Sequence, residues 1–341
     1  MRLVGIDFFK VLAILAVVVI HTHPYANPTS LMQEIIEILS NNISRFGVPF
    51  FFIVSGFFWA KKMDKGFSSL SVLTSTSKRL ALVYFIWVFV YIIFLGFYRS
   101  LLQEHNFSKV FDLMLEQITS LVSHPLELLF SGSSGHLWFL PALLSAFVLS
   151  SIFVYLKKEK YILPVAGGVY VFALLANSYS TTPLGIDFEF NTRNGPFFSW
   201  IYFAMGWKLA SIKKEYSFKY GIMLFIIGLC VQLLESYYLS VYFDKSMTGH
   251  DFLVGTLGLG LGATLMALSN PRFCNVSVAK VGSYTLGIYV LHVMVMKVLG
   301  TALHLVNIHV PDLLYPLVVL FTTTVLVLIL AKNKFLKKLV M

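Results

Sequence analysis

Apolar stretches close to 20 residues long recur along the whole chain, with short polar segments between them. About 20 residues are enough for a helix to cross the hydrocarbon core of a bilayer, and lipid-exposed backbone must form hydrogen bonds within its own helix. We therefore predict an all-α, polytopic membrane protein with about ten transmembrane helices. The predicted spans are 5–24, 46–62, 79–98, 137–156, 161–177, 196–212, 219–238, 252–269, 283–304 and 313–331.

Two further segments alternate apolar and polar residues at helical spacing. They are "SLMQEIIEILSNNI" at 30–43 and "FSKVFDLMLEQITSLV" at 107–122. This pattern is typical of amphipathic helices, which we expect to lie on the outer surface or to cap a cavity.

Composition strengthens the membrane interpretation. Of the 341 residues, 57% are hydrophobic and only 12% are charged, and the mean hydropathy is +0.80. A soluble protein has about 25% charged residues. We see no internal repeat and no low-complexity linker, so residues 1–341 are predicted to form a single transmembrane domain.

The net charge of +10 lies in short loops, which favours a topological role over binding to nucleic acid. Most of the 26 Lys and Arg residues fall on one predicted side of the membrane. The positive-inside rule then places the N and C termini in the cytoplasm. We interpret the first apolar segment as a retained helix, because no convincing signal-peptide cleavage site follows it.

The only two cysteines, Cys230 and Cys274, are far apart in the sequence. They predict neither a disulfide framework nor a zinc site of the usual kind. No metal is expected.

The first predicted helix carries a polar stripe. Lys10 and His21 are eleven residues apart, close to three turns or about 16 Å, and Asp7 lies one turn before Lys10. A charge at membrane depth costs about 2.5–3.5 kcal/mol. One alternative has Lys10 paired with Asp7 at the cytoplasmic interface and His21 at the outer interface. In the other, this face lines a reactive interior. His23 falls on another face and is expected at the interface.

Small residues interrupt the aromatic segment "RFGVPFFFIVSGFF" at 45–58. Ser55 and Gly56 favour close packing between helices. A nucleophilic role for Ser55 would require a nearby base.

Further polar residues at membrane depth are candidate site residues. In "GHLWFLPALL", His136 is expected near the depth of His21, and Trp138 suits an interfacial aromatic belt. In "SYTLGIYVLHVMVM", His292 lies near mid-membrane and requires a partner, either in a site or in a structural hydrogen bond. Tyr289, one turn before His292, is assigned with it to substrate binding.

Two basic segments complete the set of candidates. Lys78 and Arg79 in "TSTSKRLALVYF" either anchor the topology or clamp the phosphates of an anionic cofactor. Arg193 and Asn194 in the outer loop "DFEFNTRNGPFFSW" either bind an outer ligand or are simply solvated.

Five of these segments occur in a familiar order: "GIDFFKVLAILAVVVIH", "VPFFFIVSGFF", "SKR", "HLWFLPALL" and "YTLGIYVLH". In this the chain resembles the acyltransferase 3 family of bacterial membrane proteins. With "TRNGPFF", it is also similar to a subgroup that holds the enterobacterial common antigen O-acetyltransferase and the membrane half of vancomycin-resistance serine racemases.

The resemblance implies a membrane O-acetyltransferase located in the bacterial cytoplasmic (inner) membrane. Such an enzyme moves an acetyl group from cytoplasmic acetyl-CoA to a hydroxyl of a surface or lipid-linked glycan. Lys10 and His21 match the basic-residue and histidine signature of the family, with Lys in place of the usual Arg. His21 would be the general base, supported by Lys10 and Asp7.

The remaining candidates map onto two binding regions. Lys78 and Arg79, together with Lys10, would bind acetyl-CoA. The expected substrate-binding residues are His136, Trp138, Arg193, Asn194, Tyr289 and His292. Two alternatives remain: a transport or binding module for a serine-like amino acid, and a polysaccharide-export partner without catalysis.

Overall fold

A computed structural model describes residues 3–102, 106–212 and 215–340. All regular secondary structure in these ranges is helical, as the sequence predicts. Each predicted span coincides with an α-helix. These helices are α1 (Val4–Thr22), α3 (Gly47–Asp64), α4 (Ser69–Leu102), α7 (Phe139–Tyr155), α8 (Ile162–Leu175), α9 (Pro196–Ala210), α10 (Phe218–Phe243), α11 (Gly255–Leu268), α13 (Thr285–Leu305) and α14 (Tyr315–Leu330).

The number of membrane crossings is a separate matter. Among the described residues, six helical segments are long and apolar enough to cross a membrane, while α11 and α14 are shorter apolar helices. The count of ten crossings therefore stays a prediction.

Both predicted amphipathic segments form helices at the surface. They are α2 (Leu31–Ser44) and α5 (Val110–Ser123). On α5, Phe111, Leu115 and Val122 repeat at helical spacing and are exposed. Shorter helices are α6 (Pro125–Phe130), α12 (Val276–Val281) and α15 (Lys334–Val340), and single turns include η2 (Gly135–Trp138).

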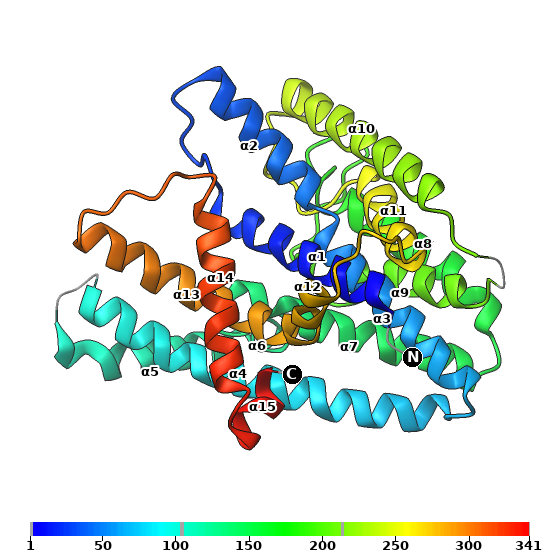
Figure 1. Ribbon diagram of the computed structural model, residues 1–341, viewed down its shortest axis with the longest axis horizontal. Helices are drawn as coiled ribbons and strands as arrows, with labels where there is room; N and C mark the ends of the chain where they lie inside the picture. Colours follow the sequence, from blue (N-terminus) through cyan, green and yellow to red (C-terminus); the bar gives the residue numbers. More distant parts are fainter. Residues whose placement is uncertain (1–2, 103–105, 213–214, 341) are drawn as a thin grey trace.

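Helix α1 runs through the middle of the bundle (Figure 1). It contacts α2, α3, α11, α12, α13 and α14. Helices α10 and α11 pack together on one side, and α4 runs with α5 and α7 along another (Figure 1). The polar stripe of α1 is thus surrounded by other helices.

Gly56 lies where α3 packs against α9. A Cβ atom at Gly56 would overlap the carbonyl oxygen of Phe203, and one at Gly206 would overlap the carbonyl of Ile53. The two backbones approach so closely that only glycine fits at either position. The packing interpretation of this small residue is confirmed.

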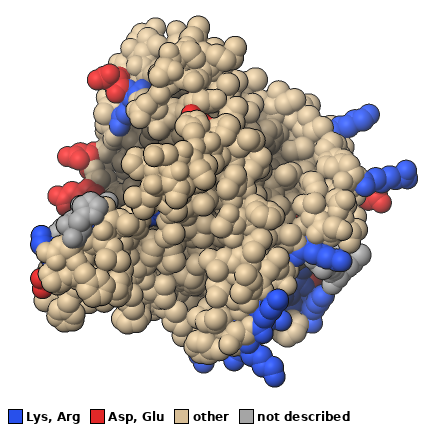
Figure 2. Space-filling view, turned by 60° about the vertical axis from the view of Figure 1, so that its left-hand side comes forward, with Lys and Arg blue, Asp and Glu red and all other residues tan. Residues whose placement is uncertain are grey.

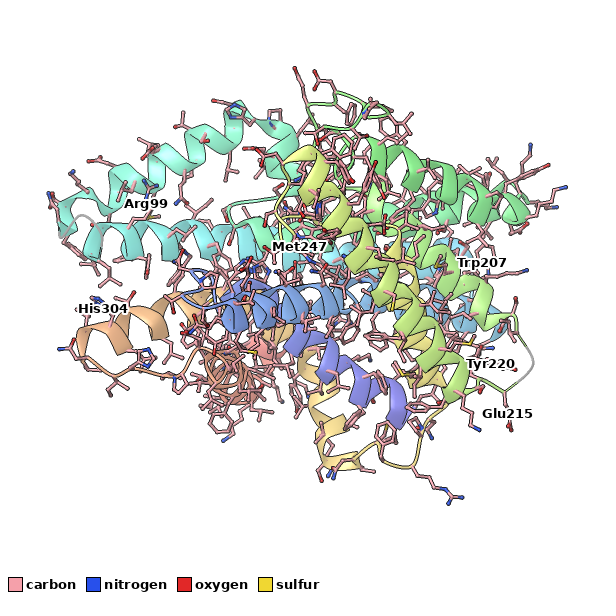
Figure 3. The ribbon with its side chains drawn as sticks, turned by 90° about the horizontal axis from the view of Figure 1, so that it is seen from above. Arg99, Trp207, Glu215, Tyr220, Met247 and His304 are labelled. Atoms are coloured by element: carbon pink, nitrogen blue, oxygen red, sulfur yellow. The ribbon has the colours of Figure 1, made fainter. Side chains whose placement is uncertain are left out.

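Loop charges separate along the length of the bundle. In Figure 2 many of the exposed Lys and Arg side chains gather at the right and lower right, and most of the visible Asp and Glu lie at the left. Figure 3 places Arg99 and His304 at one end, and Glu215 and Tyr220 at the opposite end. These positions agree with the prediction that successive loops lie on opposite sides of the membrane. The cytoplasmic location of the termini stays a prediction.

Candidate functional site

Three histidines from distant parts of the chain meet inside the bundle. His21 lies in the last turn of α1, His136 in η2, and His292 on α13. The ring centroid of His21 is 5.1 Å from that of His292 and 6.3 Å from that of His136, and the other two rings are 5.3 Å apart. The sequence predicts His136 near the depth of His21 and His292 near mid-membrane, whereas the structure brings all three rings together.

The supporting histidines are held by hydrogen bonds. His292 Nδ1 lies 2.6 Å from the carbonyl oxygen of Tyr289. Because a carbonyl only accepts, this nitrogen carries the proton and Nε2 is left as an acceptor. His136 Nδ1 pairs with Ser134 Oγ at 3.0 Å, and Tyr289 donates its hydroxyl to the backbone carbonyl of His136. Within the described residues, the Nε2 atoms of His136 and His292 are buried without a hydrogen-bond partner.

His23 does not belong to this cluster. It ends α1 in a left-handed conformation, with φ of 44°. Its ring pairs with Glu37 of α2 at 3.2 Å, and the side chain is about half exposed. The structure therefore separates His23 from His21, as the helical spacing predicts.

A small cavity of about 70 Å³ opens beside His21; we call it the His21 cavity. Arg45, Arg193 and Asp251 bring three charged side chains to its wall. Arg193 Nη1 contacts Asp251 Oδ1 at 3.0 Å, and its guanidinium lies 5.2 Å from the ring centroid of Trp138. Trp138 is buried against Phe52 and Phe198, so it supports this cavity instead of facing lipid in an interfacial belt.

A tight turn places Arg193 and Asn194. Gly195 has a φ of +64°, a conformation that favours glycine, and Pro196 then begins α9. The buried Thr192 hydroxyl donates to the carbonyl of Ala173, 2.9 Å away. Polar residues of this loop are thereby fixed on the protein framework.

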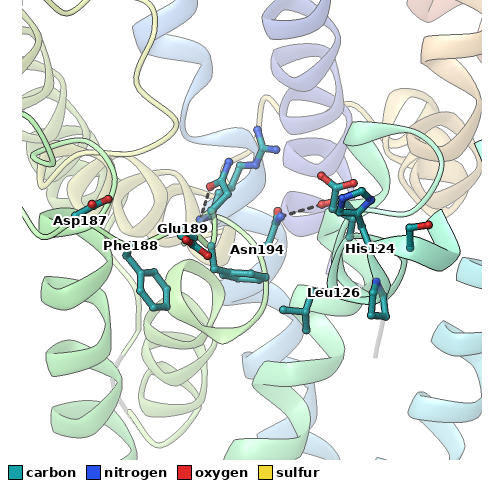
Figure 4. Close-up of a pocket in the computed structure, with 13 residues that line it drawn as sticks. His124, Leu126, Asp187, Phe188, Glu189 and Asn194 are labelled. Carbon is teal, nitrogen blue, oxygen red and sulfur yellow. Dashed lines mark hydrogen bonds between the residues drawn. The ribbon is translucent and has the colours of Figure 1, made fainter. Parts of the chain in front are cut away.

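A wide groove of about 940 Å³ lies on the other side of Arg193; we call it the Arg193 groove. Figure 4 shows Asp187, Phe188, Glu189 and Asn194 facing His124 and Leu126 across it. The Asn194 side chain is buried and donates to Ser131 Oγ at 2.9 Å. Its Oδ1 has no hydrogen-bond partner in the part of the chain that the structure describes.

At the other end of α1 lies a cavity of about 520 Å³, which we call the basic cavity. Lys10, Lys62 and Arg79 line it. Lys10 Nζ lies 3.1 Å from Asp7 Oδ1, so these two residues do pair. Lys78 lines a different cavity, with Leu82 and Phe85. The structure thus separates two neighbours that the sequence analysis assigns to one site.

A narrow cavity of about 130 Å³ lies between the basic cavity and the His21 cavity. It shares six wall residues with the basic cavity: Phe51, Ser55, Phe139, Leu143, Thr285 and Leu286. It shares Val17 and Val48 with the His21 cavity. Arg193 in turn lines both the His21 cavity and the Arg193 groove. Each of the four spaces therefore shares wall residues with the next in the series.

Two remaining candidates line or support this path. The Tyr289 ring forms part of the wall of the narrow cavity. Ser55 also faces the cavity, and its hydroxyl donates to the carbonyl of Phe51 at 2.7 Å. In the described ranges, no group of three or more His, Cys, Asp or Glu side chains is arranged to hold a metal ion.

Sequence reasoning missed three charged residues of these walls. No site role is assigned to Lys62, Arg45 or Asp251 from the sequence. Arg45 had one available signal, because it immediately precedes an apolar span. Nothing in the sequence indicates that the side chains of Arg45 and Asp251 reach the same cavity.

Comparison with known proteins gives a consistent picture. The family model of the acyltransferase 3 type, described as an acyltransferase domain, matches residues 3–332. A serine/alanine racemase of Enterococcus gallinarum is 28% identical over 259 residues, covering 72% of this chain and 34% of the racemase. An amino-acid racemase of Enterococcus faecalis is 26% identical over 323 residues, covering 91% of this chain and 42% of the racemase. The chain thus spans less than half the length of these relatives. No solved structure matches.

Proposed function

Because the chain belongs to the acyltransferase 3 family, we propose that it moves an acetyl group from cytoplasmic acetyl-CoA to a hydroxyl of a surface or lipid-linked glycan. The observation that carries this proposal is the series of four spaces that runs from Lys10 to Arg193. Donor and acceptor enter from opposite ends and meet beside His21. The location that fits this role is the bacterial cytoplasmic membrane.

The donor binds in the basic cavity. Acetyl-CoA carries several phosphate charges, which favour the cationic groups of Lys10, Lys62 and Arg79. Asp7 holds Lys10 in place through their contact of 3.1 Å. The thin pantetheine arm enters the narrow cavity and brings the thioester toward His21, about 16 Å along α1 from Lys10.

The acceptor lies in the Arg193 groove. Arg193 and Asn194 are its polar contacts nearest to the His21 cavity, and Trp138 packs under the Arg193 guanidinium. A groove of this size is within the range of small-ligand sites. Membrane lipids surround the bundle and present a lipid-linked acceptor at this depth.

His21 acts as the general base. Its neutral ring takes the proton of the acceptor hydroxyl while the hydroxyl oxygen attacks the thioester carbonyl carbon. The carbonyl electron pair moves onto oxygen, then returns as the carbon–sulfur bond breaks. The departing thiolate receives the proton from His21. The products are the acetyl ester and CoA. His136, His292 and Tyr289 orient the reacting groups from the buried side.

Purified protein in lipid nanodiscs tests the proposal. Mass spectrometry under native conditions is expected to detect bound acetyl-CoA in both the unchanged protein and a His21→Ala variant. Only the unchanged protein is expected to transfer labelled acetyl to a glycan-lipid fraction. Full transfer by His21→Ala would remove His21 from the mechanism, and absence of acetyl-CoA binding would remove the donor assignment.

The relatives named serine/alanine racemase motivate a second candidate, which is uptake of a serine-like amino acid. It uses the same spaces without chemistry. Accumulation of labelled serine in proteoliposomes, without any acetyl transfer, would favour this candidate.

A further inference from the structure

The charges around the His21 cavity do not cancel. Two guanidinium groups, those of Arg45 and Arg193, face one carboxylate, that of Asp251. The carboxylate contacts Arg193 Nη1 at 3.0 Å. With a neutral His21, the formal charge of the cavity wall is positive.

Arg45 is the guanidinium that has no direct ion pair among the described residues, although the Asp251 carboxylate is close enough to act on it electrostatically. Its Nε and Nη2 donate to Asn41 Oδ1 at 3.0 and 2.9 Å. Nη2 also donates to the carbonyl oxygen of Thr248 at 2.9 Å, and Nη1 to that of Asp251 at 3.4 Å. Every one of these acceptors is a neutral oxygen. The guanidinium is therefore fixed in position while its charge is not neutralised by them.

Among the described residues, this arrangement supplies Arg45 with hydrogen bonds but with no directly bonded carboxylate oxygen. Removing a charged group from water requires compensation by a partner of opposite charge or by several hydrogen bonds. A carboxylate at position 41 would provide both. The chain instead has Asn41, which is buried and whose Nδ2 has no partner among the described residues. The positive charge remains available to whatever enters the cavity.

We propose that Arg45 is a catalytic residue that stabilises a negative oxygen formed beside His21. This inference rests on the proposed function. The oxygen is that of the thioester carbonyl, which becomes an oxyanion when the acceptor hydroxyl attacks the carbonyl carbon and His21 takes the proton. Pre-positioned donors aimed at developing charge are among the largest contributions to catalysis. A cavity of about 70 Å³ suits a small group such as an acetyl carbonyl.

Arg45 could instead bind a permanent anionic group on the glycan acceptor. A reaction without any glycan distinguishes this role from stabilisation of the thioester oxyanion. Slow hydrolysis of acetyl-CoA uses water as the acceptor and forms the same oxyanion. A role limited to an anionic acceptor leaves this hydrolysis unchanged.

An Asn41→Asp variant tests the proposal most sharply. It keeps the shape of the side chain and both contacts with Arg45, but it neutralises the guanidinium charge. A structural arginine gains an ion pair, so stability is retained or raised. A catalytic arginine loses its effect on the oxyanion, so the kcat of hydrolysis falls.

The measurement uses the full chain in nanodiscs, with acetyl-CoA as donor and a thiol reagent to detect released CoA. For Asn41→Asp we expect kcat to fall by about 100-fold, as for loss of an oxyanion donor. The Kd for acetyl-CoA should stay unchanged, and the thermal unfolding midpoint should not fall. An Arg45→Lys variant keeps the positive charge but loses the planar guanidinium with its several donors. We expect its kcat to fall less than that of Arg45→Gln. Unchanged kcat in Asn41→Asp would overturn the proposal.

The same measurements distinguish failure of the proposed function from failure of the role of Arg45. If the unchanged protein neither binds acetyl-CoA nor releases CoA, the proposed function fails. If it does both and Asn41→Asp matches it, only the assignment of Arg45 fails.

Discussion

The imidazole of His292 lies 5.1 Å from that of His21, centroid to centroid, although the two residues are 271 positions apart in the sequence. The backbone carbonyl of Tyr289 fixes the His292 ring by accepting from Nδ1 at 2.6 Å. The ring of the proposed base is therefore in contact with a second ring that is itself held in place.

Replacement of His292 tests this positioning role. A His292→Phe variant keeps a ring of similar size and removes the nitrogen atoms. We expect kcat to fall by about 10- to 100-fold, because small errors in the position of a base are costly, with little change in KM for acetyl-CoA. Steady-state CoA release measures both constants. A rise in KM with kcat intact would assign His292 to donor binding instead.

Neighbouring basic residues provide a matched pair for the donor site. Arg79 lines the basic cavity and Lys78 lines another. We expect Arg79→Gln to raise the Kd for acetyl-CoA about tenfold, equivalent to about 1.5 kcal/mol for one charge-assisted contact. The difference in Kd between Arg79→Gln and the unchanged protein should be smaller at high salt, because Arg79 is exposed at the opening of the basic cavity and its charge is screened. Lys78→Gln is expected to leave the Kd unchanged. Equal effects of the two variants in isothermal titration calorimetry would contradict the separation that the structure shows.

Helix packing at Gly56 is expected to tolerate no side chain. The added Cβ of Gly56→Ala overlaps the carbonyl oxygen of Phe203, so α3 and α9 must move apart. We expect a loss of about 1–3 kcal/mol and a clear drop in the thermal unfolding midpoint in detergent. Gly168→Ala is the control, because a Cβ at that helical position meets nothing within 4 Å. An unchanged midpoint for Gly56→Ala would show that the helices do not approach so closely.

Acid stability depends on His250, in the loop between α10 and α11. Burial, followed by the positive charges of Arg45 and Lys245, lowers the pKa of His250 from 6.5 to about 4, while Asp251 acts in the opposite direction. The unfolded chain binds a proton at this residue near pH 6.5, but the folded protein does so only near pH 4. Stability therefore falls as the pH falls through this window.

A His250→Gln variant should lose this part of the pH dependence. Unfolding midpoints measured from pH 7 to pH 4 are expected to fall less steeply than for the unchanged protein. His309→Gln, at an exposed loop position, is the control and should follow the unchanged protein. Identical slopes for all three proteins would show that His250 is not kept neutral by its surroundings.

The sequence predicts helices well here because their signal is local. Apolar length and spacing are properties of each segment alone, so all ten predicted ranges fall on helices. The site depends instead on contacts between segments. Nothing near Arg45 in the sequence indicates that it meets His21, since α1 and the start of α3 must first pack together.

Single positions show the same limit. Lys78 and Arg79 differ by one residue, which turns a side chain by about 100° around the helix and directs the two into different cavities. Trp138 has the composition of an interfacial residue, but packing against Phe52 and Phe198 places it inside. The polar stripe of α1 was predictable because its three residues share one helix.

The narrow cavity matters for ion leakage across the membrane. A water-filled path from one face of the membrane to the other would dissipate the proton gradient. None of the residues that line this cavity is charged, and its volume is about 130 Å³. An ion that entered would lose its hydration shell without compensation, which is how hydrophobic constrictions close pores. Under the proposed function, this cavity would have to admit the uncharged pantetheine arm without letting ions pass.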